Sequence, residues 1–105
     1  MKTEKLLDIV VKTLDEKNGG DIKTLYVTEK TSIADYFVIA TGKNITHVRA
    51  LAESVEEKLE EEGVFAARKE GIKEGRWAVI DYITVIVHIF NSDTRDFYCL
   101  EKLWQ

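Results

Sequence analysis

The sequence predicts a single α/β domain over residues 1–105, in which a mixed sheet of about five strands carries helices on one face. The chain has 105 residues, which is the size of one domain. Apolar residues recur at helical spacing in two long segments, and short runs rich in valine and isoleucine are typical of strands. The elements are expected in the order helix, strand, strand, helix, strand, strand, strand, helix.

The first predicted element is an amphipathic helix over residues 3–16. Leu6, Val10 and Leu14 share one face of it, which is the spacing of a helix packed on a core. The sequence NGG at residues 18–20 follows. Because glycine readily adopts the left-handed cap conformation, the helix is expected to end there.

Two strands and a second helix come next. The strands are expected over residues 22–27 and 36–40, and the second is apolar throughout, as in a central strand covered on both faces. Asn44 is a suitable N-cap for the helix that follows, and Gly63 closes it. Glutamates occupy the side of this helix away from its apolar stripe, which predicts a solvated surface.

The second half of the chain predicts three more strands and a last helix. The strands are expected over residues 64–67, 77–81 and 83–90, with a tight hairpin between the last two. Asn91 or Ser92 is positioned to cap the last helix, which is expected to end near Trp104.

Composition limits the possible partners. The formal net charge is −4 and the pI is about 5.2, which argues against extensive nucleic-acid binding and favours a basic protein partner. Cys99 is the single cysteine, as expected for a reducing compartment, and we expect a cytoplasmic protein. No apolar run is long enough to cross a membrane.

The sequence gives little support for a metal site, a cofactor site or a catalytic nucleophile. His47, His88 and Cys99 share no ligand-like spacing, so no metal site is predicted. His47 is expected to be exposed near the start of a helix, and His88 to be a hydrogen-bonded structural residue within a strand. Cys99 lacks the signature of a catalytic thiol and is interpreted as structural.

The alternative enzymatic hypothesis is nucleotide binding or nucleotidyl transfer. That chemistry needs a glycine turn followed by two carboxylates alternating on one strand, which together hold metal ions. Gly19, Gly20 and Asp35 supply part of this pattern, but Phe37 stands where the second carboxylate is required. Asp35 is interpreted more simply as a strand-entry residue that bonds nearby backbone.

Aromatic residues gather in the second half of the chain. Strand alternation puts Trp77 and Asp81 on the sheet face opposite Ala78 and Ile80, which suit a core under helices. An aromatic side chain beside a charge on an open sheet face is typical of a protein-binding surface. Burial of Trp77 in the core is the other interpretation, and the sequence pattern leaves both open.

Several motifs together resemble the Iojap/RsfS family of ribosomal silencing factors, over nearly the whole chain from about Lys5 to Trp104. The matching stretches are residues 31–42 (TSIADYFVIATG), 47–50 (HVRA), 70–71 (EG), 75–82 (GRWAVIDY), 85–90 (VIVHIF) and 97–104 (FYCLEKLW).

The resemblance implies a fold related to nucleotidyltransferases without their catalytic acids, and a protein that is not an enzyme and needs no cofactor. It implies binding to the large ribosomal subunit through its fourteenth protein, at the face that joins the small subunit. Occupying that face blocks subunit association and represses translation when nutrients are short. Family members often form homodimers when free. A dimeric adaptor with another partner is the remaining alternative.

The resemblance also suggests the residues that contact the partner. Tyr98 is expected at the start of the last helix, bordering the same face as Trp77. No catalytic, cofactor or metal residue is carried over. The partner-binding residues implied are Trp77, Asp81, Tyr82 and Tyr98, with Phe90 and Lys102 less closely matched.

Overall fold

The computed structural model describes residues 1–98, and its described side chains end at Arg95. The elements are α1 (Thr3–Glu16), β1 (Gly20–Tyr26), β2 (Tyr36–Gly42), α2 (Ile45–Glu61), β3 (Arg68–Glu70), β4 (Trp77–Asp81), β5 (Val85–Asn91) and α3 (Ser92–Tyr98). The strands form one five-stranded sheet in the order β1-β2-β5-β4-β3. The central pair β2–β5 is parallel and the other pairs are antiparallel. The predicted α/β fold with a mixed sheet is confirmed, as is the predicted element order.

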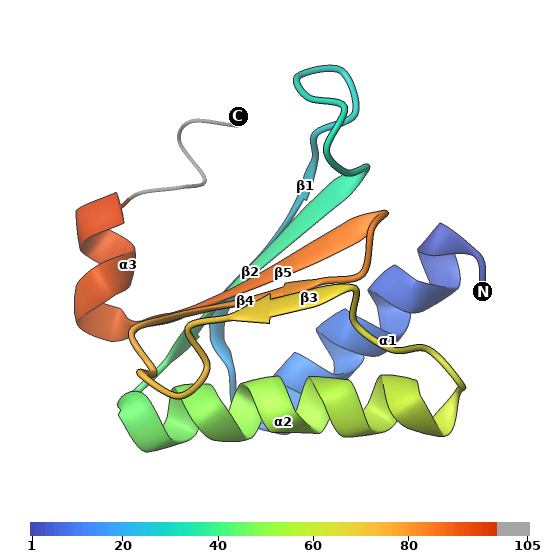
Figure 1. Ribbon diagram of the computed structural model, residues 1–105. Coiled ribbons are helices and arrows are strands. Elements are labelled where there is room, and N and C mark those ends of the chain that lie inside the picture. The colour runs from blue at the N-terminus through green and yellow to red at the C-terminus, as the bar shows by residue number, and fades with distance from the viewer. Residues whose placement is uncertain (99–105) are drawn as a thin grey trace.

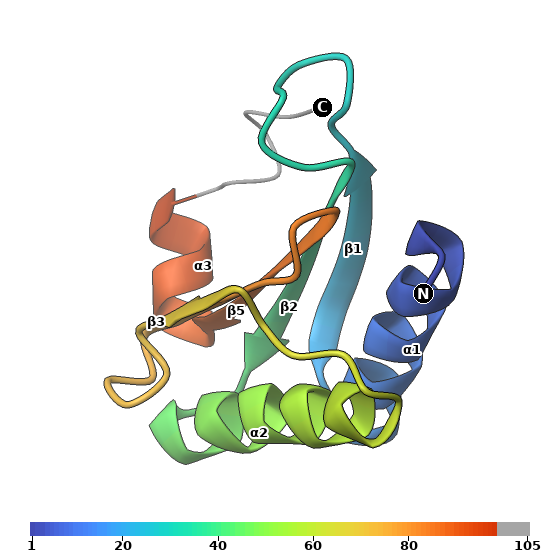
Figure 2. The same cartoon turned by 45° about the vertical axis from the view of Figure 1, so that its right-hand side comes forward.

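Two long helices cover one face of the sheet. Figure 1 shows α1 and α2 packed against that face, whereas α3 lies on the opposite side, and Figure 2 shows the same layers after rotation. Apolar side chains fill the space between these helices and the sheet because both helices are amphipathic. The fully buried members on α2 and the strands include Val48, Leu51, Val55, Leu59, Val38, Ala40, Ala78, Ile80, Val87 and Ile89.

The ends of the helices follow local signals. α1 has the predicted bounds, but Asn18, with φ 66°, adopts the left-handed conformation that was expected of the glycines after it. The Asn44 side chain caps α2 as predicted, accepting from the His47 N–H at 2.9 Å. Gly63, with φ 78°, follows the end of α2. No helix in the described part of the chain is both long and apolar enough to span a membrane.

All the strands but β4 differ from prediction at one or both ends. β1 begins at Gly20 rather than at residue 22. The short strand predicted at 64–67 is found at Arg68–Glu70, an edge strand exposed throughout, which therefore has no apolar pattern to mark it. β5 begins at Val85 because residues 82–84 form the turn that follows β4.

That turn holds an isoleucine in a strained conformation. Ile83 has φ 71°, in the left-handed region that β-branched residues rarely adopt. Its N–H donates to the Asp81 carboxylate over 2.7 Å, and the Tyr82 N–H donates to the Val85 carbonyl at 2.9 Å. The Ile83 side chain is 67% exposed, so burial offsets little of the strain.

We predict that Ile83→Gly raises the free energy of unfolding by about 1 kcal/mol. A side chain in the left-handed region costs roughly 1–2 kcal/mol, and glycine removes that strain while adding some entropy to the unfolded chain. Urea denaturation at neutral pH measures the change. Ile83→Ala keeps a Cβ and should gain nothing, so an equal gain in both variants would refute strain as the cause.

Candidate protein-binding site

The sheet face turned away from α1 and α2 is built from alternate residues of three strands. Ala78 and Ile80, on the helix side of β4, are fully buried, while Trp77 and Asp81 are partly exposed on the opposite side. The predicted alternation along β4 is therefore confirmed. Strand pairing aligns the side chains of this face in rows across β4, β5 and β2: Trp77–Phe90–Thr41, Val79–His88–Ile39 and Asp81–Ile86–Phe37.

Trp77 combines the two interpretations left open by its sequence. Its indole stacks on Phe90, with ring centroids 4.9 Å apart and planes 27° apart. Its Nε1–H donates to Nδ1 of His88 over 3.1 Å. The residue is nevertheless only half-buried. Trp77 is thus packed against the sheet and still partly accessible, which suits an anchor held in a fixed orientation.

His88 is a buried, neutral imidazole at the centre of this face. Burial lowers its pKa to about 4, so the ring is uncharged at neutral pH. Because Nδ1 accepts from Trp77, the proton of the neutral ring resides on Nε2. That Nε2 has no hydrogen-bond partner in the described part of the chain. The structural role predicted for His88 is confirmed, through one ring nitrogen.

Two of the suggested contact residues are buried. Tyr82 is 6% exposed and packs into the core beneath α2, and its burial raises the pKa of its phenol above the usual range. The physical reason is parity, since residue 82 continues the inward series of Ala78 and Ile80. Phe90 points to the same face as Trp77 but is fully buried beneath it.

Asp81 lies at the rim of the face, already engaged. One carboxylate oxygen accepts from the Ile83 N–H at 2.7 Å, and the other lies 4.0 Å from Nε of Arg68 on β3. The Asp81 side chain is 19% exposed. The carboxylate therefore shapes the hairpin turn and also places a negative charge beside the open face.

The remaining suggested residues lie at the end of the chain. Tyr98 lies six residues after the start of α3 at Ser92 rather than at the start of the helix, which corrects its predicted position. The side chain of Tyr98 lies outside the described residues, as do Cys99, Lys102 and the predicted helix end at Trp104. Their predicted roles stay predictions.

Motif residues outside the face hold the connection that leads into Trp77. Arg49 on α2 donates from Nε to the Lys73 carbonyl at 2.7 Å and from Nη2 to the same oxygen. Gly71 and Gly75 both have φ 72°. A Cβ at Gly71 would lie 2.1 Å from the Trp77 carbonyl oxygen, and one at Gly75 would lie 2.5 Å from Ile45. These positions therefore require glycine, and they fix the entry into β4.

A charged hollow of about 620 Å³ lies between α2 and this connection. Lys69 Nζ pairs with Glu56 Oε1 at 2.8 Å within it, and the hydrogen bond to that carboxylate raises the pKa of Lys69. Its lining carries both signs of charge. The hollow is thus an exposed surface of mixed charge, where ion pairs contribute little to stability.

Neither histidine is arranged as a metal ligand. His47 is half-buried rather than exposed, and both ring nitrogens are used: Nδ1 accepts from the Lys43 N–H at 2.9 Å and Nε2 lies 3.0 Å from the Lys17 carbonyl. The ring thus joins the start of α2 to the end of α1. Within residues 1–98, no group of three or more His, Cys, Asp or Glu side chains gathers as metal ligands would.

The residues of the enzymatic hypothesis are far apart. Gly20 pairs with Thr41 near the end of β2, whereas Asp35 precedes the start of the same strand. At about 3.3 Å per residue, the two sites lie on the order of 20 Å apart. The Asp35 carboxylate accepts from the Thr28 hydroxyl at 3.0 Å, a bond to a side chain rather than to the nearby backbone that was predicted. The fold therefore does not assemble the predicted fragments into one site.

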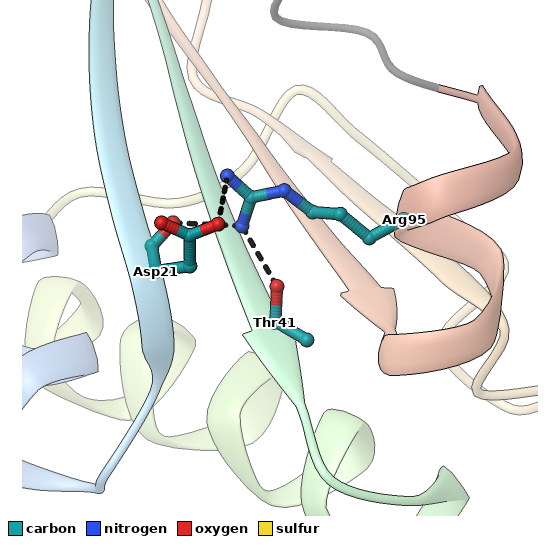
Figure 3. A network of polar contacts seen from close by, with 3 residues as sticks. All are labelled: Asp21, Thr41 and Arg95. Atoms are coloured by element: carbon teal, nitrogen blue, oxygen red, sulfur yellow. Dashed lines mark hydrogen bonds and ion pairs between the residues drawn. The ribbon is translucent and has the colours of Figure 1, made fainter.

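Sequence reasoning missed the arginine that holds α3 on the open face (Figure 3). Arg95 is buried, and its Nη1 donates at 2.7 Å to both the Asp21 carbonyl and the Thr41 hydroxyl. Its Nη2 lies 3.3 Å from the Asp21 carboxylate. Asp21 has a φ of 45° and lies where the register of the β1–β2 pairing shifts, between Gly20 and Lys23. The partners are far apart in the sequence, so no local motif marks them.

We predict that the free energy of unfolding decreases as the pH is lowered, because His88 becomes protonated. Its pKa is near 6.5 when unfolded and about 4 when folded, so between these values only the unfolded chain binds the proton. Above this window the ring is neutral in both states, and its full contribution to the free energy of unfolding is present. It decreases by about 3 kcal/mol as the pH falls through it, at about 1.4 kcal/mol per unit.

Urea denaturation of the wild type and of His88→Leu across this pH window measures the effect. Leucine fills similar space without a titrating group, so the variant should lose less stability on acidification. Parallel pH dependences for the two proteins would contradict the assignment to His88.

The whole chain, residues 1–105, matches the model of a family described as "Ribosomal silencing factor during starvation". The ribosomal silencing factor RsfS of Bacillus subtilis (strain 168) is 36% identical over 104 residues, which cover 99% of this chain and 88% of that protein. A mouse protein named "Mitochondrial assembly of ribosomal large subunit protein 1" is 29% identical over 101 residues, covering 93% of this chain and 44% of the mouse protein.

Solved structures agree with these sequence matches. A crystal structure of a protein from Chromobacterium violaceum has a TM-score of 0.96 at 35% identity, covering 99% of this chain and 87% of that one. A Bacillus halodurans structure has a TM-score of 0.88 at 33% identity, covering 97% and 95%. The family match along the full length and the shared fold confirm the resemblance, and the chain belongs to the family of ribosomal silencing factors.

Proposed function

We propose that this protein silences ribosomes by binding the large subunit at the face that joins the small subunit, and so blocks their association. The mechanism is steric and needs no turnover or cofactor. Membership of the silencing-factor family supports it, and the mouse relative is named for assembly of a ribosomal large subunit. Translation is repressed because large subunits held in this way form no complete ribosomes.

One observation carries the choice of surface. Trp77 lies half-exposed on the sheet face that α1 and α2 leave open, stacked on the buried Phe90 and hydrogen-bonded to His88. Interface hot spots are enriched in tryptophan, and an anchor whose orientation is already fixed loses less entropy on binding. We therefore propose Trp77 as the central contact, with Asp81 at the rim.

The proposed partner on the large subunit is its fourteenth protein. A net charge of −4 on this chain favours a basic partner surface. Tyr98 and Lys102 remain proposed contacts at the edge of the same surface. Tyr82 and Phe90, which are buried, would contribute by supporting the surface from beneath.

We also propose that the free protein is a homodimer and that it acts in the cytoplasm. The family resemblance supports the homodimer. The single cysteine, Cys99, fits a reducing compartment, where structural disulfides are rare.

We predict that Trp77→Ala lowers the affinity for purified large subunits by roughly thirtyfold, which corresponds to about 2 kcal/mol. The free energy of unfolding should fall by less than the roughly 3–5 kcal/mol of a fully enclosed tryptophan, because the indole is half-buried. Co-sedimentation with large subunits and urea denaturation measure the two effects.

The matched control for this substitution is Phe65→Ala, which removes an aromatic ring that is 68% exposed in the connection between α2 and β3. It should bind as the wild type does. A folded Trp77→Ala protein that still binds large subunits and blocks joining at wild-type affinity would remove Trp77 from the interface.

We predict that Asp81→Asn slows association with large subunits at low salt by roughly twofold to fivefold, because a charge at the rim steers a basic partner. Asparagine keeps an oxygen that can accept from the Ile83 N–H, so the turn should persist. Stopped-flow association at two salt concentrations measures the effect, which should shrink at high salt. Asp8→Asn, on exposed α1 surface, is the charge-matched control. An unchanged rate for Asp81→Asn at low salt would count against its position at the interface.

A further inference from the structure

The indole of Trp77 is oriented by a side chain on the neighbouring strand. Trp77 pairs directly with Phe90, and His88 occupies the diagonal position on β5, opposite Val79. Long aromatic side chains reach such diagonal neighbours. The two contacts differ in kind. Stacking on Phe90 fixes the plane of the indole, and the 3.1 Å bond to His88 fixes which edge turns inward.

His88 is suited to accept a hydrogen bond permanently. It is 7% exposed and lies among the rings of Phe37, Trp77 and Phe90, at centroid distances of 4.9, 5.9 and 6.4 Å. These surroundings disfavour the charged ring, so the Nδ1 lone pair stays available at physiological pH.

The two ring nitrogens of His88 differ in their surroundings. The Nε2–H of His88 is buried and finds no acceptor among the described residues. A buried donor left unpaired destabilises the fold, whereas an apolar side chain of similar shape would not. Within the described part of the chain, Nε2 therefore gives the imidazole no advantage over an apolar side chain. The benefit of the imidazole lies in its other nitrogen, which binds Trp77.

We propose that His88 is a positioning residue of the binding surface, whose Nδ1 holds the Trp77 indole in the orientation that the large-subunit protein recognises. The inference rests on the proposed function and deepens it. Because the only polar group of the indole is bonded to His88, Trp77 offers its partner apolar ring surface and no free donor. The matching group on the partner is accordingly an aliphatic chain or a lysine or arginine cation packed on the ring.

Two substitutions of His88 in the full chain separate positioning from packing. His88→Leu fills the space without an acceptor, and His88→Asn keeps an oxygen close to the position of Nδ1. The indole N–H resonance of Trp77 in NMR spectra, identified by its loss in Trp77→Phe, reports the hydrogen bond. Dissociation from purified large subunits reports the function.

We expect His88→Leu to shift the indole resonance upfield and to speed dissociation about tenfold, with no loss of melting temperature at neutral pH. His88→Asn should recover both the resonance and the dissociation rate to within about twofold of the wild type. In a Trp77→Phe background, which has no indole N–H, His88→Leu should cause no further change, since coupled residues show non-additive effects.

The outcomes distinguish the two claims. Wild-type chain that fails to bind large subunits overturns the proposed function and the positioning role together. If the wild type binds and His88→Leu dissociates at the same rate, the positioning role alone is overturned. Equal defects in His88→Leu and His88→Asn, with the indole resonance restored only in the latter, would also overturn it, because packing would then be the cause.

Discussion

The parallel pairing of β2 with β5 is the constraint on which the rest of the structure depends. It joins Tyr36–Gly42 to Val85–Asn91 at the centre of the sheet, and both strands are buried along almost their whole length. One register sets both faces at once, since alternate residues point to opposite sides. If β5 slipped by one residue, His88 would point into the core beneath the helices, and Phe90 would no longer stack against Trp77.

The sequence predicts those elements that carry a local apolar pattern and misses contacts that depend on strand pairing. β2 and β5 are continuous apolar runs and α1 is strongly periodic, so each was predictable from local pattern. β3 is an exposed edge strand, and no apolar period marks it. Alternation along β4 predicted the outward Trp77, and the same rule, applied one step further, would have placed Tyr82 inside. The bond between Trp77 and His88 depends on a diagonal across two strands, which local pattern does not contain.

Two polar contacts frame the open face from opposite ends of one row. Trp77, Phe90 and Thr41 are aligned across β4, β5 and β2. At one end, His88 holds Trp77 over Phe90; at the other, Arg95 bonds to Thr41 and Asp21 and so fixes α3. The Arg95 network joins residues that lie 74 and 54 positions apart in the sequence, which is why sequence motifs did not reveal it. The fully buried Phe90 thus lies between two fixed elements.

The use of polar groups on this face argues for recognition by shape. The indole N–H of Trp77 is bonded to His88, the Asp81 carboxylate accepts from the Ile83 N–H, and Arg95 is engaged by Asp21 and Thr41. Catalytic sites instead direct polar groups toward a reacting atom. Most apolar side chains of this face, among them Ile39, Ile86 and Phe90, are buried, whereas Trp77 is partly accessible. Under the proposed function, Trp77 binds through complementary packing, and the charge of Asp81 acts mainly on the rate of encounter.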